Sequence, residues 1–412
     1  METHPEKFLG AALECYRKGN LPQAEIYCRA ALRNNPAQAD ALVLLGMIAL
    51  SVGAPGFAVR HLESALALAP SHPAADKYLR HARAQTPPER PGEAAYILIK
   101  AWGYGFWADV DHVLGGLLLA EITGRIPVIH WGSNSLFRAE GVEETFTRFF
   151  EPVSSSSAPD LTGRGYSFYP PKWSDDNLLD NDVAKWAGAY SRIAALHLLN
   201  RPENVIVSDF HTGIHDIVPW IDKDHELGGM DIAGVYRHLV KKYLKLKPEI
   251  AARVDEFWSR HMGDQVVLAL HMRGSDKAVE LPDIEQLHDS FHENIRLALD
   301  KHEPSSLFVL TDSSQLLDEF KRKYRGIPVI HTDCTRTDSS TGIHYQKLPQ
   351  PERLAHEVIM DTYLAARADA FIGNGYSNVS LAISHLKDWA PGRCVLCGGN
   401  MSTEPNFFLH DW

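Results

Sequence analysis

Two cations and a glycine follow directly on an apolar run near the middle of the chain. The run is Val266–Leu270, and the residues after it are His271, Met272, Arg273, Gly274, Ser275, Asp276 and Lys277. A short apolar run bounded by turn residues is typical of a buried parallel strand. An arginine offers a forked donor to phosphate oxygens and a lysine offers a point charge, so the segment suits a diphosphate. A strand followed by a solvated polar turn explains the same pattern equally well.

Two more predicted strands also end in polar residues. The strand Leu307–Leu310 runs into Thr311 and Asp312, and the strand Ala370–Gly373 runs into a loop where a new helix begins. Ser377 is the expected N-cap of that helix, whose free backbone N–H groups can bind an anion. Loops at the carboxyl edge of a parallel sheet converge on one crevice, so we expect a ligand site there.

The elements that position these loops alternate regularly in the second half of the chain. Besides the three strands, we expect helices over about 283–301, 314–324 and 351–367, and a strand over 328–331. Strands that alternate with helices predict a parallel sheet.

The first half shows the same rhythm less clearly. Residues 94–101 read as a strand, Gly103–Trp107 as a glycine turn, Asp109–Thr123 as a helix and Ile126–Trp131 as the next strand. This β-turn-α-β unit also predicts a parallel sheet.

Three further segments complete the first half. Val205–Phe210 reads as another strand, and residues 231–261 read as two helices that split near Pro248 and connect the two halves. Residues 150–182 contain a serine run and an acidic stretch, and we expect an insertion over the sheet edge.

Residues 5–38 and 39–72 repeat with a period of 34. The first unit has Gly19, Ala24, Ala31 and Pro36, and the second has Gly53, Ala58, Ala65 and Pro70. Small residues let two helices pack closely, and proline ends the second helix of each pair, so the pattern resembles tetratricopeptide repeats. Residues 73–84 resemble a capping helix. Two repeats and a cap fall below the usual three, so we expect this module to pack on the next domain, either as a groove for a partner or as a brace or dimerisation element.

Composition excludes several classes of protein. With 45% hydrophobic and 23% charged residues, the chain is an ordinary soluble globular protein, and its net charge of −11 argues against general binding of nucleic acid or anionic membranes. Five cysteines form no disulfide framework, and Cys394 and Cys397 lack a second pair for zinc, so buried thiols on a strand are expected. No signal peptide and no apolar run of membrane-spanning length is visible, which favours the cytoplasm.

Several of these segments resemble motifs of a known family. The pattern His271-x-Arg273-x-x-Asp276-Lys277 resembles the donor-site motif of α1,6-fucosyltransferases, including the rhizobial nodulation enzymes, and its H-x-R core is similar to that of protein O-fucosyltransferases. Three further segments match in order: Gly103–Trp107 with His112, then Leu307–Asp312, and then Asp361 and Asp369 followed by Ser377–Val379. The resemblance covers about residues 94–400.

This resemblance implies an α/β fold with a GT-B-like pair of Rossmann-type domains behind the all-α tetratricopeptide-repeat module. The expected units are residues 1–85 (repeat module), 94–250 (acceptor side) and 264–400 (nucleotide-sugar side). It also implies a metal-independent, inverting glycosyltransferase that needs no cofactor and uses GDP-fucose as donor. The acceptor would be a protein, peptide or glycan recruited by the repeat module.

The resemblance also assigns roles to residues. Arg273 would grip the β-phosphate, and Ser377 would present its hydroxyl and N–H to the pyrophosphate. The implied donor-binding set is His271, Arg273, Asp276, Lys277, Asp312, Asp361, Ser377, Asn378 and Val379. No Asp-x-Asp pair follows a strand to hold a metal, so cations and backbone donors would stabilise the leaving diphosphate. The implied catalytic set is Arg273 with a base for the acceptor; the base candidates are Glu280, His112 and Asp111.

The chain departs from the α1,6-enzymes at one position, since Gly274 stands where they carry a second arginine. The change removes one charge-assisted contact worth about 1.5–3 kcal/mol, which Lys277 can partly replace. Two alternatives therefore stay open: a transferase of the same fold that uses a different nucleotide sugar, and an inactive repeat-bearing scaffold.

Overall fold

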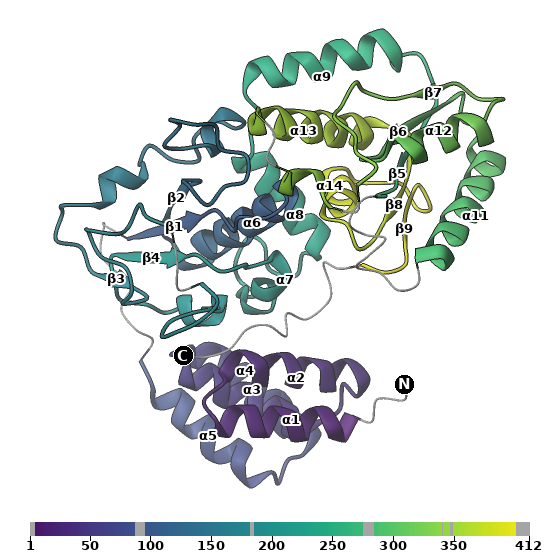
Figure 1. Ribbon diagram of the computed structural model, residues 1–412. Helices are drawn as coiled ribbons and strands as arrows, with labels where there is room; N and C mark the ends of the chain where they lie inside the picture. The colour runs from purple at the N-terminus through teal and green to yellow at the C-terminus, as the bar shows by residue number, and fades with distance from the viewer. Residues whose placement is uncertain are drawn as a thin grey trace.

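The computed structural model describes residues 5–86, 95–181, 185–274, 284–339, 341–346 and 349–400. Five N-terminal helices lie beneath an α/β body that holds two parallel sheets (Figure 1). Among the residues so described, no helix combines the length and apolarity needed to cross a membrane.

The N-terminal helices follow the period seen in the sequence. They are α1 (Pro5–Arg17), α2 (Leu21–Asn34), α3 (Ala39–Ser51), α4 (Pro55–Leu68) and α5 (Pro73–Ala84). Gly19 and Gly53 have positive φ values of 81° and 71° at equivalent turns, where glycine is the least strained residue. The four alanines of the pattern are fully buried. The 34-residue period of the sequence thus corresponds to repeated helix pairs. The assignment of these pairs to the tetratricopeptide class stays a prediction.

The helical module packs on the α/β body, as its small number of repeats predicts. Ala58 and Leu62 share one hydrophobic cluster with Phe210 and Trp220 of the body. The rings of Phe57 and Trp220 lie 5.1 Å apart. The module and the body therefore share a hydrophobic core.

The first sheet is fully parallel and has the strand order β2-β1-β4-β3. Its strands are β1 (Tyr96–Lys100), β2 (Ile126–His130), β3 (Phe168–Tyr169) and β4 (Val205–Ser208). Helix α6 (Phe106–Thr123) connects β1 to β2 and begins three residues earlier than the sequence predicts.

The insertion covers one face of this sheet and not only its edge. Leu161, Trp173 and Leu178 pack in one cluster with the strand residues Leu98 and Val207. The insertion also supplies strand β3, which pairs with β4 and which the sequence did not indicate.

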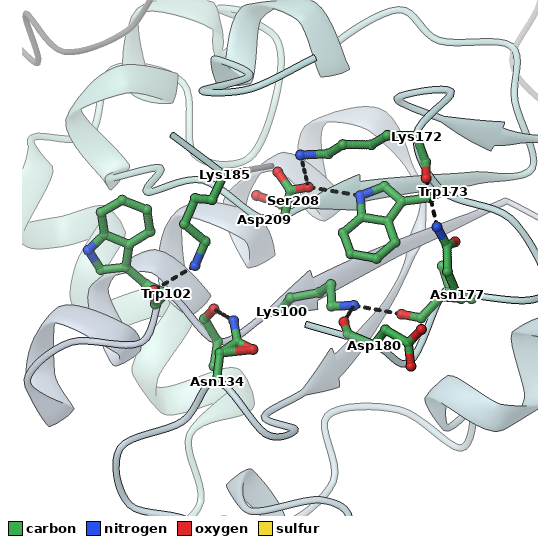
Figure 2. A network of polar contacts seen from close by, with 12 residues as sticks. Lys100, Trp102, Asn134, Lys172, Trp173, Asn177, Asp180, Lys185, Ser208 and Asp209 are labelled. Carbon is green, nitrogen blue, oxygen red and sulfur yellow. Dashed lines mark hydrogen bonds and ion pairs between the residues drawn. The ribbon is translucent and has the colours of Figure 1, made fainter. Parts of the chain in front are cut away.

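A buried lysine fastens the insertion to the end of β1. Lys100 is 2% exposed, and its Nζ donates to the carbonyl oxygens of Leu178 (2.7 Å) and Asp180 (2.5 Å) (Figure 2). The same Nζ lies 3.8 Å from the ring centroid of Trp173, a cation–π arrangement. The ammonium group thus exchanges water for carbonyl oxygens and an indole face.

Three helices lead from the first sheet to the second. They are α7 (Ile214–Ile217), α8 (Ile232–Tyr243) and α9 (Pro248–His261), so the predicted split before Pro248 is confirmed. Short 3-10 helices lie at Phe146–Arg148, Ala158–Leu161, Ala195–Leu198, Val218–Trp220 and Ile343–Tyr345.

The second sheet is also parallel and has the strand order β7-β6-β5-β8-β9. Its strands are β5 (Val267–His271), β6 (Ser306–Leu310), β7 (Val329–Ile330), β8 (Ala370–Asn374) and β9 (Cys394–Cys397). The helices are α11 (Ile284–His302), α12 (Ser314–Lys323), α13 (Pro351–Arg367) and α14 (Asn378–Leu386). The predicted alternation is therefore confirmed, with boundaries that differ by a few residues.

The two cysteines of the C-x-x-C pattern point to opposite faces of strand β9. Cys394 packs in the cluster that contains Phe371, whereas Cys397 packs in the cluster that contains Ile372. Residues three apart on a strand alternate in this way, so the two thiols do not form a chelating pair.

Trp220 is the side chain of the body that most directly supports the helical module. Replacing it with alanine should cost about 3–5 kcal/mol, because a large aromatic residue is lost from a packed interface. Limited proteolysis should then release residues 1–85 from Trp220→Ala but not from Leu68→Ala, whose side chain on α4 is 47% exposed. A single cooperative unfolding transition with no release in Trp220→Ala would show that the module is stable without this contact.

Candidate functional site

One cavity of about 350 Å³ collects residues from the carboxyl ends of both sheets. From the first sheet it takes the segment Trp102–Ala108 and Phe137. From the second sheet it takes the ends of β5, β6 and β8, with additional residues after β7 and on α13. The convergence of three polar loops predicted from the sequence is therefore confirmed.

Most of the predicted donor-binding residues line this cavity. They are His271, Arg273, Asp312, Asp361, Ser377, Asn378 and Val379. Asp276 and Lys277, and the proposed base Glu280, lie outside the described residues.

Arg273 and Asp312 form an ion pair at the cavity wall. The Nε of Arg273 lies 3.4 Å from Oδ2 of Asp312, and the N–H of Gly274 donates to Oδ1 of the same carboxylate at 2.9 Å. Both side chains are less than one-fifth exposed, which strengthens the pairing relative to a surface ion pair. Asp312 therefore orients the guanidinium group from the neighbouring strand.

The close packing of helix α12 explains why a glycine follows Arg273. A Cβ atom at Gly274 would lie 2.7 Å from Cδ1 of Leu316 and 2.8 Å from Cβ of Ser313. The first turn of α12 would have to shift to admit any side chain there. The packing of this turn therefore requires a glycine at position 274.

His271 is a buried, neutral imidazole in the cavity wall. Its Nδ1 lies 2.7 Å from Oγ of Ser380 on α14. Burial, reinforced by the nearby charge of Arg273, lowers the pKa of His271 to about 3. Its contact with Ser380 positions α14 against β5.

Asp361 is a buried carboxyl group on helix α13. Its Oδ1 accepts a hydrogen bond of 2.5 Å from Oγ1 of Thr332. Burial raises the pKa of Asp361 to about 6, although the Thr332 hydroxyl and Arg336 oppose the shift. One helical turn earlier, Glu357 also lines the cavity and accepts the N–H of Thr335 at 2.8 Å. The sequence reasoning missed Glu357, although its spacing of four residues from Asp361 places both on one face of the helix.

Ser377 begins helix α14 as predicted, but its side chain does not cap the helix. The residue is 1% exposed, and its Oγ has no hydrogen-bond partner among the described residues. A buried hydroxyl without a partner is costly and calls for an explanation. Since Ser377, Asn378 and Val379 all line the cavity, the hydroxyl and the helix N-terminus offer hydrogen-bond donors to it.

His112 is not suited to the catalytic role expected from the sequence. Its Nε2 lies 3.2 Å from the carbonyl oxygen of Ser208, and its Nδ1 accepts the N–H of Thr212 at 3.0 Å. The residue is fully buried, burial lowers its pKa to about 3, and it does not line the cavity. The histidine therefore ties α6 to the end of β4.

Asp111, the other base candidate on α6, also lies outside the cavity lining. Its Oδ2 is 3.3 Å from Nε2 of His211. The described residues thus leave the base unassigned on this helix.

One group of described residues has the spacing of a metal site, but one of its carboxylates is already paired with a lysine. Glu121, Glu226 and His238 place their ligand atoms within 4.8 Å of one another. Oε1 of Glu121, however, lies 2.5 Å from Nζ of Lys242 and accepts the Tyr243 hydroxyl at 2.6 Å. The group lies outside the cavity lining and carries no metal assignment.

No protein-family model matches the sequence, and a search of curated proteins found no match. Solved structures with some likeness include NodZ α-1,6-fucosyltransferase with GDP (19% identity, 70% of this chain and 92% of that chain, TM-score 0.45). NodZ from Bradyrhizobium matches at 18% identity over 70% and 92% of the two chains, with a TM-score of 0.44. POFUT1 with GDP-fucose matches at 12% identity over 75% and 100%, with a TM-score of 0.44. At these values the likeness assigns no activity to this chain.

Removing the Ser377 hydroxyl should change the stability of the fold and its affinity for a ligand in opposite directions. Ser377→Ala should raise the free energy of unfolding by about 1 kcal/mol, since an unpartnered buried hydroxyl is lost. If the cavity takes a diphosphate, as the sequence predicts, the variant should bind it about tenfold more weakly, with GDP as the probe. Chemical denaturation and calorimetry measure the two effects. Ser384→Ala on the same helix is the control, because that hydroxyl already donates to the Leu381 carbonyl. Lower stability with unchanged affinity in Ser377→Ala would contradict a donor role.

Asp361 should make the unfolding free energy depend on pH. Its folded pKa of about 6 lies above its ordinary 3.8, so the stabilisation is present below the ordinary value and is lost as pH rises through about 6. The loss between about pH 4 and pH 7 is on the order of 3 kcal/mol. Urea unfolding of the wild type and Asp361→Asn should therefore diverge over this range. Parallel pH profiles for the two proteins would show that Asp361 does not titrate there.

Proposed function

We propose that this chain is a glycosyltransferase that binds a nucleotide sugar, most readily GDP-fucose, in the cavity between two Rossmann-type halves of a GT-B-like fold. One observation carries the proposal: Arg273 and the start of α14 at Ser377 meet in a single cavity. A guanidinium group and free helix N–H groups are the donors that a diphosphate requires.

The donor occupies the cavity with its diphosphate between Arg273 and the Ser377–Val379 turn. Asp312 and Asp361 lie on the side of the second sheet and accept hydrogen bonds from the nucleoside. The sugar then contacts the part of the lining that comes from the first sheet, Trp102 and Tyr104–Ala108. In this proposal, residues 1–85 form the helical module, residues 94–250 form the acceptor side, and residues 264–400 bind the nucleotide sugar.

The chemistry follows from this placement of charge. An acceptor hydroxyl attacks the anomeric carbon as the bond to the diphosphate breaks, which inverts the configuration and leaves negative charge on the nucleoside diphosphate. Arg273 and the α14 N–H groups stabilise that charge without a metal ion. Glu280 stays the proposed base for the acceptor hydroxyl. The helical module recruits the protein, peptide or glycan that carries this hydroxyl.

A different sugar on the nucleotide is the second candidate, and Gly274 favours it. The first turn of α12 fills the space beside Gly274, so the second cation of the α1,6-enzymes has no room here. A donor pocket with one arginine fewer can orient a different sugar ring.

Arg273→Ala tests the proposal directly. Losing a charge-assisted contact should cost about 1.5–3 kcal/mol, so GDP affinity should fall about 10- to 100-fold. Arg260→Ala is the matched control, because this arginine on α9 is 64% exposed and pairs with its helix neighbour Glu256.

Thermal stabilisation by a panel of GDP- and UDP-sugars should then rank the donors. The strongest stabilisation by GDP-fucose supports the first candidate, and the strongest by another sugar nucleotide supports the second. Equal GDP affinity in Arg273→Ala and the wild type, or no stabilisation by any nucleotide, would falsify the transferase assignment.

A further inference from the structure

We propose that Asp109, Asn134 and Lys185 act together as positioning residues that hold the turn at residues 101–104, and with it the cavity wall that faces the donor sugar. The inference rests on the proposed function, since it assigns the sugar to this wall. It concerns residues that do not themselves line the cavity.

Backbone groups of four consecutive residues are held by these three side chains. Nδ2 of Asn134 donates to the carbonyl oxygen of Ala101 at 2.6 Å, and Nζ of Lys185 donates to that of Trp102 at 2.7 Å (Figure 2). The side chains reach the turn from the loop after β2 and from the segment before β4.

Asp109 completes the arrangement from the first turn of α6. Its Oδ1 accepts the N–H of Gly103 at 2.8 Å and that of Tyr104 at 3.2 Å. Gly103 has a φ of +88°, and a Cβ there would lie 2.8 Å from the backbone oxygen of Asn134. The turn therefore requires a glycine at this position and packs closely against the backbone of Asn134.

The turn sets the position of two aromatic rings in the cavity wall. Trp102 and Tyr104 stack with their ring centroids 4.9 Å apart, and both line the cavity. Lys185 lies 4.8 Å from the Trp102 ring centroid, so it restrains the indole as well as the carbonyl. A shift of the turn would move both rings relative to a bound sugar.

The arrangement places charges where water does not reach them. Asp109 is fully buried and Lys185 is 8% exposed. Oδ2 of Asp109 has no hydrogen-bond partner among the described residues. A turn on the surface would need no such cost, because water would satisfy its backbone groups. These buried contacts therefore keep the cavity wall at residues 101–104 in order, which an ordinary surface turn does not require.

The hold of Asp109 on the turn depends on its ionisation. Burial raises the pKa of Asp109 to about 7, while the Gly103 and Tyr104 N–H groups, Lys185 and His211 favour the charged form. His112, the neighbouring buried histidine, is neutral in this range because burial lowers its pKa. Because burial outweighs these groups and the folded pKa lies above its ordinary 3.8, the closed turn should open more readily as the pH rises through about 7.

Comparison of GDP with GDP-fucose isolates the wall from the nucleotide site. Asp109→Ala should raise the Kd for GDP-fucose about tenfold, because a small misplacement of the wall weakens contacts to the sugar, and should leave the Kd for GDP within about twofold. Asp109→Asn keeps an oxygen acceptor and should recover most of the loss. Calorimetry measures both constants. Asp160→Ala is the control, because Asp160 accepts the Ser157 N–H in the same way outside the cavity.

Amide hydrogen exchange reads the turn itself. Protection of the Gly103 and Tyr104 amides, corrected for intrinsic rates, should fall as the pH rises through about 7 in the wild type, stay flat in Asp109→Asn and be lost in Asp109→Ala. A purely global loss of stability would instead raise exchange throughout α6.

The outcomes separate the two proposals. A wild type that binds neither nucleotide overturns the proposed function, whatever the variants do. A wild type that binds both, with equal losses for GDP and GDP-fucose in Asp109→Ala or no loss for either, overturns the positioning role. Unchanged exchange of the two amides in Asp109→Ala overturns it as well.

Discussion

The carboxyl edges of two parallel sheets face one cavity, and the candidate site depends on this constraint. In a parallel sheet every strand ends at the same edge, so the loops after β5, β6 and β8 meet without any direct contact between them in the sequence. The register aligns His271 with Leu310 on one side and Gly373 on the other, which brings three strand ends to one level. Helices begin at the same edge, so the N-terminus of α14 adds its backbone donors to the side chains.

Buried polar groups gather at these edges. Lys100, Asp109, His271 and Asp361 are each less than one-tenth exposed, and the first two form hydrogen bonds to backbone groups of nearby loops. Burying each group costs desolvation free energy, which its hydrogen bonds offset. In the low dielectric constant of the interior, the strength of these bonds depends strongly on their geometry. Loops held in this way are ordered before any ligand arrives. Side-chain hydrogen bonds thereby fix the backbone of these loops, as backbone hydrogen bonds fix the strands and helices.

The sequence predicts the strands of the second sheet well because each is a short apolar run with turn residues behind it. That pattern, with parallel pairing, is sufficient to bring Arg273, Asp312 and Ser377 together. It cannot reveal that the Ser377 hydroxyl leaves its own helix uncapped, or that both nitrogens of His112 contact backbone groups of a remote loop. Contacts such as Lys185 with the Trp102 carbonyl join residues 83 positions apart, and no local periodicity reports them. The insertion was recognised by composition, yet its coverage of a sheet face depends on contacts of the same long range.

Trp102 belongs to two structures at once. Its ring packs against the hydrophobic cluster that the helical module shares with the body, and it also lines the cavity. Recombination at the segment after α5 could not exchange the helical module alone, because the module and the body share one hydrophobic core. Any lineage that altered these repeats would have to adjust the cavity wall in step. A change that displaced this one indole ring would act on the shared core and on the cavity together.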